Sequence, residues 1–197
     1  MSDPDLNALI GSRICHDLIS PLGAIGNGVE LLNMAGMASG PEMALISESV
    51  ENANARIRFF RVAFGAASAE ARVGRSEILS ILDGMYRAGR MNVVWSLAGD
   101  HPRRLVKQSF LALQCVESAL TWGGDVTLSG DAGRLILEGK GERVKFDEAL
   151  WHLATGRSKA ADLAASDVHF ALLPLTSAQN GRPVEVDAGE DFLRVSF

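Results

Sequence analysis

The feature that most constrains this chain is a row of small and apolar residues that repeats at alternating steps of four and three positions. Between Leu6 and Leu32 the first row contains Ile14, Leu18, Pro21, Ile25, Gly28 and Leu32. From Glu42 onward the second row contains Ile46, Val50, Ala53, Ile57, Phe60 and Phe64. Such steps place side chains on one face of an α-helix and are typical of a helix-packing seam. The sequence therefore predicts two long helices, separated by the glycine-containing stretch 33–41.

Two helices joined by so short a connection form an antiparallel hairpin, which cannot enclose a core by itself. Either a second copy of the chain pairs with the hairpin to form a four-helix bundle, or the hairpin packs on the rest of its own chain. We favour the homodimer, because both seams are long and regular. Residues 1–70 are assigned to this helical domain.

The pattern changes after the hairpin, and residues 75–197 are assigned to an α+β domain with a sheet covered by two or three helices. Helices are expected over 76–89, 102–123, 147–155 and 166–179. Strands are expected over 92–99, within 125–139 on both sides of an Asp-Ala-Gly turn, over 182–189 and over 191–197. Ser166 is the expected N-cap of the last helix, which should end near Asn180 and Gly181.

Composition excludes several classes of function. The 197 residues are 47% hydrophobic and 22% charged, as in a globular protein. The net charge is −5 and no run of Lys and Arg exceeds two residues, which argues against nucleic acid as a partner. No apolar run approaches the ~20 residues that span a bilayer, and charges interrupt the N-terminus, so we expect a cytoplasmic protein without a membrane partner. Cys15 and Cys115 are far apart and are expected to be free thiols.

Helical geometry places His16 opposite the first seam. Each residue advances by about 100°, so His16 lies at about 200° from Ile14 and should face solvent. The same face contains Leu9, Ser12, Arg13, Ile19, Ser20, Gly23 and Asn27. Exposed aliphatic groups around a polar centre are typical of a docking surface.

The residues around His16 favour phosphoryl chemistry. A neutral imidazole is a nucleophile when one nitrogen is free and an acceptor holds the other. Asp17 can accept a hydrogen bond from Nδ1 and leave Nε2 free, and Arg13 can offset phosphoryl charge. Pro21, which removes a backbone donor, should loosen the helix nearby.

The stretch HDLISPL, residues 16–22, resembles the phospho-acceptor box of dimerising histidine kinases, with Ile19 replacing the usual basic residue. Residues 166–197 are similar to the last helix, glycine turn and two strands of the kinase ATP-binding domain. The nucleotide motifs depart from that pattern. Where kinases have an Asn-x-x-x-Asn-Ala box, this chain has Gln114, Ser118 and Ala119. The stretch EGKGERV (138–144) does not match the motif of the adenine pocket. The glycine-rich phosphate loop is replaced by AASDVHF (164–170). The loss of three nucleotide contacts predicts that ATP is not bound.

A kinase-like acceptor helix without an ATP site resembles the ChpT family of alphaproteobacterial histidine phosphotransferases, and RICHDLISP (13–21) and FFRVAFGAAS (59–68) carry that resemblance. It implies a homodimer with a four-helix bundle and two degenerate ATPase-like α/β sandwich domains. His16 would accept a phosphoryl group from a receiver-domain aspartate of a hybrid kinase and pass it to a receiver aspartate of a response regulator. Magnesium would be held by the receiver, and this chain would need no cofactor.

Roles for the other residues follow from this resemblance and from helical position. Asp17 would orient the ring of His16. Contacts to the phosphoryl group or receiver would come from Arg13, Ser20 and Asn27. Docking would use Leu9, Ile19 and Gly23. The receiver surface could extend to Arg56, Arg58 and Arg61 on the second helix, although such charges are usually just solvated.

Three other interpretations remain open at this point. The chain could be an active histidine kinase if the altered pocket still binds nucleotide, or a non-enzymatic docking or inhibitor module that does not need His16. A metal site formed by Cys15, His16 and Asp17 is the weakest alternative, because consecutive helical side chains diverge by about 100°. The isolated His101, His152 and His169 are expected to be structural.

Overall fold

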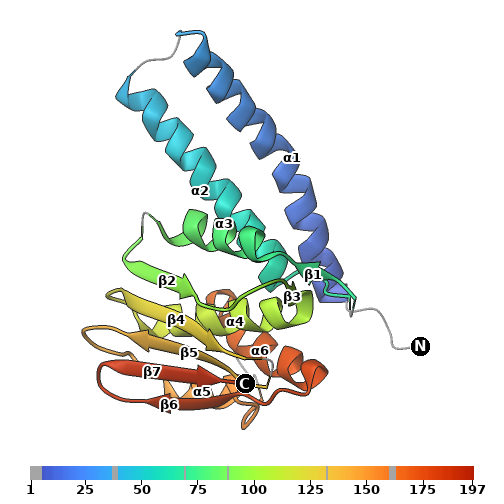
Figure 1. Cartoon of the computed structure of the whole chain (residues 1–197), viewed down its shortest axis with the longest axis vertical. Coiled ribbons are helices and arrows are strands. Elements are labelled where there is room, and N and C mark those ends of the chain that lie inside the picture. Colours follow the sequence, from blue (N-terminus) through green and yellow to red (C-terminus); the bar gives the residue numbers. More distant parts are fainter. Residues whose placement is uncertain (1–5, 37–39, 69, 88, 132, 160–162) are drawn as a thin grey trace.

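The computed structural model describes residues 6–36, 40–68, 70–87, 89–131, 133–159 and 163–197, but not the side chains of residues 6–10, 12 and 13. Figure 1 shows a hairpin of two long helices that projects from an α/β body. The hairpin consists of α1 (Leu6–Met34) and α2 (Pro41–Ala63). Both predicted helices are therefore confirmed, and α1 continues through Pro21 without ending there.

The predicted seam of α1 is not the surface that packs on α2. The less exposed side of the described part of α1 contains Cys15, Ile19, Leu22, Gly26 and Val29. A Cβ added at Gly26 would lie 3.4 Å from Cγ1 of Val50, so this side faces α2. The exposed fractions of the seam residues Ile14, Leu18, Ile25 and Leu32 are 54%, 46%, 51% and 40%. The apolar surface of α1 is wider than the predicted seam. The helix that packs on it, α2, covers the apolar residues beside the seam and leaves the seam itself exposed.

The lower half of α2 packs on the α/β body. Phe59, Val62 and Ala63 are fully buried and belong to one hydrophobic core with residues of the body. The ring of Phe59 stacks on that of Phe110, with centroids 4.5 Å apart and an interplanar angle of 7°. The base of the hairpin therefore packs on its own chain, whereas the seam of α1 stays uncovered. The division of the chain into the domains 1–70 and 75–197 stays a prediction.

The body contains a five-stranded mixed sheet with the strand order β2-β4-β5-β7-β6. Its strands are β2 (Met91–Trp95), β4 (Gly124–Gly130), β5 (Leu135–Lys140), β6 (Glu185–Ala188) and β7 (Phe192–Ser196). The pair β2 and β4 is parallel and the other pairs are antiparallel. A small antiparallel pair, β1 (Arg72–Val73) with β3 (His101–Pro102), lies beside the base of the hairpin (Figure 1).

Helices cover one face of this sheet (Figure 1). The covering helices are α4 (Arg103–Ala119), α5 (Glu148–Ala154) and α6 (Val168–Asn180). A further helix, α3 (Arg75–Tyr86), lies between α2 and β2 in the sequence. The helix α4 lies directly on β5, because a Cβ added at Gly139 would come within 2.8 Å of Cγ1 of Val116. The predicted α+β architecture with two or three covering helices is confirmed.

Local signals explain the turn between β4 and β5 and the end of α6. Asp131 accepts hydrogen bonds from the backbone N–H groups of Gly133 and Arg134 at the predicted turn between β4 and β5. Gly181, with a φ of 65°, ends α6 in the left-handed conformation that glycine allows, as predicted.

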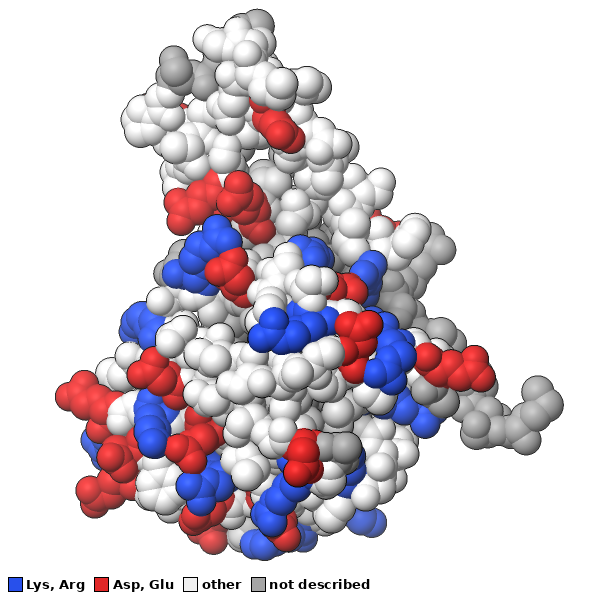
Figure 2. Space-filling view, viewed as in Figure 1, with Lys and Arg blue, Asp and Glu red and all other residues white. Residues whose placement is uncertain are grey.

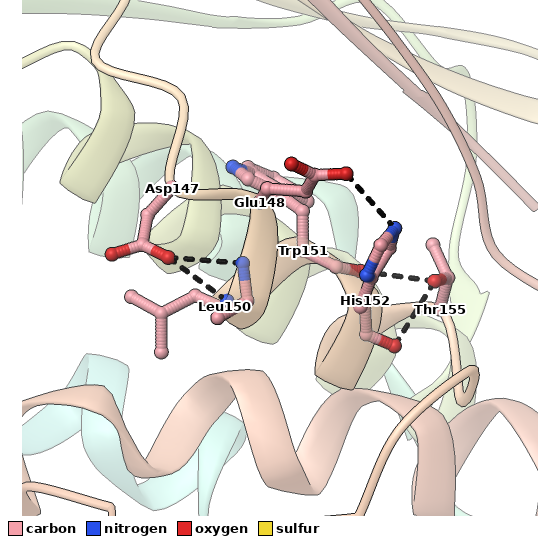
Figure 3. Close-up of polar contacts among 7 residues, drawn as sticks. Asp147, Glu148, Leu150, Trp151, His152 and Thr155 are labelled. Atoms are coloured by element: carbon pink, nitrogen blue, oxygen red, sulfur yellow. Dashed lines mark hydrogen bonds and ion pairs between the residues drawn. The ribbon is translucent and has the colours of Figure 1, made fainter.

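An aspartate side chain caps the start of α5. The carboxylate of Asp147 caps α5 by accepting from the N–H groups of Ala149 and Leu150 (Figure 3). The prediction that Ser166 caps α6 is wrong. Ser166 lies within a 3₁₀ turn, Ala165–Asp167, and Asp167 precedes the helix. The short turn shifts the start of α6 by one residue beyond the position that Ser166 would cap.

No helix within the described ranges is long and apolar enough to cross a membrane.

Candidate functional site

His16 stands on the outside of α1, and 82% of its side chain is exposed. Its Nδ1 lies 3.1 Å from Oδ1 of Asp17. Because a carboxylate only accepts hydrogen bonds, this contact favours the neutral tautomer that has its proton on Nδ1 and a lone pair on Nε2. Within the described part of the chain, no side chain forms a hydrogen bond with Nε2. The ring is thus held in the tautomer that exposes a nucleophilic nitrogen.

His16 lines a hollow of about 600 Å³ between the base of the hairpin and the body. The first wall is formed by α1, which contributes His16, Ile19 and Ser20. The opposite wall consists of Arg61, Ala66, Ser68, Ala71 and Arg103. Two guanidinium groups therefore share a hollow with the imidazole, and none of its described lining residues is a carboxylate.

The start of α4 holds the end of α2 in place. Arg103 donates from Nη2 to the carbonyl oxygen of Arg61 at 2.7 Å and from Nε to that of Ala66 at 3.1 Å. Lys107, only 8% exposed, donates from Nζ to the carbonyl oxygen of Gly65 at 2.8 Å. Cationic donors satisfy the last carbonyls of a helix and interact favourably with its dipole. Burial, and next the positive charge of Arg61, lower the pKa of Arg103 from its usual value, and Glu77 opposes that shift.

Arg61 lines the hollow from α2. Its Nη2 lies 3.8 Å from Oε1 of Glu77, and both side chains are about half exposed. Burial raises the pKa of the Cys15 thiol, and the charge of Arg61 partly offsets that rise. This influence on Cys15, together with the shared hollow, places the Arg61 guanidinium beside the segment that carries His16.

Some of the other predicted site residues line the hollow and others do not. Ser20 is exposed and lines the hollow, whereas Asn27 is exposed but is not among the lining residues. Ile19, expected to be an exposed aliphatic residue, is half-buried in the wall, because its position on α1 also turns toward α2. A Cβ added at Gly23 would meet no atom within 4 Å, so the surface there is open. The side chains of Leu9 and Arg13 lie outside the described residues.

The three arginines of α2 do not share one surface. Arg58 donates from Nη1 to Oγ of Ser80, on α3, at 3.2 Å. The charge of Arg56 acts on Tyr86, at the end of α3. Only Arg61 of these three lines the hollow of His16. Sequence reasoning grouped Arg61 with the other two and missed Arg103, because helical position alone does not show which α2 side chain meets a residue of α4.

The weakest alternative, a metal site, finds no support in the geometry. The thiol of Cys15 is buried against α2, whereas the ring of His16 is exposed. The parts of the chain that the structure describes contain no group of three or more His, Cys, Asp or Glu side chains suited to a metal ion.

Ser118, which stands where kinases have an asparagine of the nucleotide box, contacts α6. Ser118 Oγ donates to the carbonyl oxygen of Gln114 and lies 3.1 Å from Nε2 of His169. His169 is buried beside the ring of Phe170. Burial lowers the pKa of His169 to about 4, although the charge of Asp167 opposes this shift. The side chains of Ser118 and His169, both at altered positions, therefore interact with each other.

The remaining histidines have structural contacts, in keeping with the roles expected for them. The ring of His101 packs edge-on against Trp95. His152 Nε2 lies 3.7 Å from Oε1 of Glu148, one turn earlier on α5, and the hydroxyl of Thr155 donates to the carbonyl oxygens of Trp151 and His152 (Figure 3).

Known proteins resemble both halves of this molecule. Residues 75–192 match the family model of the histidine phosphotransferase C-terminal domain. The chain is 32% identical to the protein phosphotransferase ChpT of Brucella abortus (strain 2308) over 194 residues, which covers 95% of this chain and 92% of that protein. It also matches the solved structure of a bacterial phosphotransferase with a TM-score of 0.70 and 31% identity, over 100% of this chain and 97% of that one. These similarities, which extend across hairpin and body alike, show that the chain belongs to the family of ChpT-like histidine phosphotransferases.

Proposed function

We propose that this histidine phosphotransferase carries the phosphoryl group of its phosphorelay on His16 and works as a homodimer. The observation that carries this proposal is the exposed imidazole whose Nδ1 is held by Asp17 and which lines a hollow containing two guanidinium groups. Receiver domains of a hybrid kinase and of response regulators are the proposed donor and acceptors.

The proposed step is an in-line exchange at phosphorus. The Nε2 lone pair of His16 attacks the phosphorus of an aspartyl phosphate in the donor receiver. An N–P bond forms, the P–O bond to the aspartate breaks, and the aspartate leaves as a carboxylate with the electron pair. Nδ1 keeps its proton, and Asp17 balances the positive charge that the ring acquires. Attack on phosphohistidine by the carboxylate of a second receiver reverses the step.

We propose that this exchange needs no nucleotide or metal from this chain. Magnesium is expected in the receiver domain, where it would offset phosphoryl charge. Ser118 and Gln114 lack the side chains of a kinase nucleotide box, and Ser118 is engaged with His169 instead. These contacts support the absence of autokinase activity, and a cytoplasmic location suits two free cysteines.

The other residues near His16 have proposed contact roles. Arg13, Ser20 and Asn27 would contact the phosphoryl group or the receiver. Leu9, Ile19 and Gly23 would form the docking surface. The position of Ser20 in the hollow and the open surface at Gly23 support these assignments.

The uncovered seam of α1 supports a second copy of the chain as its partner. A continuous apolar row at coiled-coil spacing is expected to be covered, and in a symmetric dimer the same row serves both subunits. Residues 14–55 contain no Lys or Arg, and the outer part of the hairpin shows none in Figure 2. We propose that two hairpins pair along this seam into a four-helix bundle.

A transfer assay tests the acceptor. A receiver domain carrying labelled aspartyl phosphate is mixed with the purified protein, and acid-labile, base-stable label is followed onto it. Wild type and His16→Gln are compared with His152→Ala, a change at a histidine of α5. We expect label on wild type and His152→Ala alone. Label on His16→Gln would refute the assignment, and relay activity of that variant would favour a docking module instead.

Sedimentation tests the dimer. Ile25→Glu places a carboxylate on the seam and should yield monomers, whereas Ala24→Glu adds the same charge at a neighbouring exposed position outside the seam. A wild-type protein that sediments as a monomer, or an Ile25→Glu variant that stays dimeric, would contradict the proposed bundle.

A further inference from the structure

We propose that Arg61 is a catalytic residue of the phosphoryl exchange, and that its guanidinium binds the oxygens of the phosphoryl group in transit at Nε2 of His16. This inference rests on the proposed function of His16. It goes beyond that function by assigning a role to a side chain of α2 that approaches from the opposite wall of the hollow.

The charge in the hollow points to an anion. Arg61 and Arg103 both line it, and no described lining residue carries a negative charge. The like charge of Arg61 contributes to the lowered pKa of Arg103, so the two guanidinium groups lie close enough to disfavour each other. The chain as a whole has a net charge of −5. Among the described lining residues the positive charge of the two arginines is therefore unbalanced, although Asp17 lies beside His16 and Glu77 beside Arg61. A phosphoryl group in the hollow would relieve the repulsion between the two arginines.

The two arginines differ in the hydrogen bonds and ion pairs that their guanidinium groups already form. Arg103 donates through Nε and Nη2 to backbone carbonyls at the end of α2. It therefore supports the wall of the hollow. Arg61 has a long ion pair with Glu77, 3.8 Å, in which both side chains are about half exposed. Exposed ion pairs of this kind are weak, so a phosphoryl group can replace Glu77 as the partner of Arg61.

The chemistry of the exchange gives such a cation a role. In the loose transition state, negative charge is spread over the three equatorial oxygens while the P–O bond breaks and the N–P bond forms. Arg61 would donate two N–H groups to those oxygens in the bidentate geometry that guanidinium favours. It exchanges no proton and forms no covalent bond, so the balance of the step at His16 is unchanged. Its contribution is to offset charge in the transition state.

Single-turnover kinetics test the assignment. Transfer from a phosphorylated receiver domain is measured over a range of receiver concentrations for wild type, Arg61→Gln and Arg61→Lys. The matched control is Arg58→Gln, one turn earlier on α2, whose side chain contacts Ser80 on α3. We expect Arg61→Gln to lower the maximal rate constant about 10–100-fold, Arg61→Lys to retain part of the rate, and Arg58→Gln to stay within about twofold.

The outcomes separate this inference from the proposed function. An unchanged maximal rate for Arg61→Gln, or a change only in the receiver concentration at half-saturation, would overturn the catalytic role. The latter result would leave Arg61 as a docking residue. His16→Gln is measured in parallel, and label on that variant would refute the proposed function itself. Circular dichroism of each variant checks that the helices are intact, and Arg61→Lys keeps the test informative if Arg61→Gln does not fold.

Discussion

The Nδ1 atom of His16 and the Oδ1 atom of Asp17 lie 3.1 Å apart, on adjacent residues of one helix. The ring of the proposed acceptor is therefore oriented by its immediate neighbour on the same helix. Both side chains are at least half exposed, so they hold this geometry while open to an approaching protein.

Replacement of Asp17 by Asn should slow phosphoryl transfer about 3–10-fold. The amide oxygen can still accept from Nδ1, but it lacks the charge that strengthens the hydrogen bond and balances the phosphorylated ring. Single-turnover transfer at saturating receiver concentration measures the effect, with Glu30→Gln on the same helix as the control. Equal rates for Asp17→Asn and wild type would show that the charge of Asp17 does not contribute to the transfer.

Gly23→Ala should separate stability from docking. An added methyl group meets nothing within 4 Å, and Ala in a helix interior is favoured over Gly by about 0.5–1 kcal/mol, so the free energy of unfolding should rise. A receiver that packs closely on this surface would meet the same methyl group. The receiver concentration at half-saturation should therefore increase several-fold. An unchanged value in a stabilised variant would remove Gly23 from the docking surface.

His169 should make the protein less stable as the pH falls. Burial is the main cause that lowers its pKa to about 4 in the folded protein, whereas a histidine in the unfolded chain has its ordinary pKa of about 6.5. Between pH 6.5 and 4 the unfolded state thus binds more protons, and the folded state loses up to about 3 kcal/mol relative to neutral pH. Stability from this group is fully present above pH 6.5.

Urea unfolding of wild type and His169→Gln at pH 7 and pH 4.5 measures this contribution. Other titrating groups affect both proteins alike, so the loss between the two pH values should be smaller by about 2–3 kcal/mol in the variant. Identical losses would mean that His169 is not held neutral by its burial beside Ser118.

Lys107→Met should destabilise the junction between hairpin and body by about 1–3 kcal/mol. The variant keeps the apolar stem but removes the buried donor to the carbonyl oxygen of Gly65, which is then left without that partner. Arg104→Met is the matched control, because Arg104 is exposed and its longer bond of 3.3 Å to Ala67 should contribute less than about 1 kcal/mol. Urea unfolding compares the two, and equal losses would contradict the special role of the buried lysine.

Local patterns were sufficient to predict most of the fold. The alternating spacing of apolar residues indicates both long helices, and Asp131 and Gly181 mark a turn and a helix end through their own chemistry. Ser166 shows where such signals fail: it and Asp167 are both acceptable caps, and a short 3₁₀ turn decides between them. The sequence could not indicate which stripe of a broad apolar band meets α2, because that depends on how the two helices rotate against each other.

The sequence predicted only the part of the site that α1 contributes. His16, Asp17 and Ser20 lie within two turns of α1, where helical periodicity relates them directly. Arg61 and Arg103 belong to other helices, and their approach to His16 depends on packing at the base of the hairpin. Nothing in the sequence of α2 distinguishes the arginine that lines the hollow of His16 from the one that contacts Ser80.

The hydrogen bonds from Arg103 and Lys107 to the end of α2 bear on how this protein could diversify. A hairpin fused to a different body would retain His16 but lose Arg103 and the other residues of the hollow that follow α2. Chimaeras between relatives should therefore exchange α1, α2 and the first turns of α4 together. Substitutions in the body, which contributes Arg103 to the hollow, would change the surroundings of His16 while the acceptor helix stays unaltered.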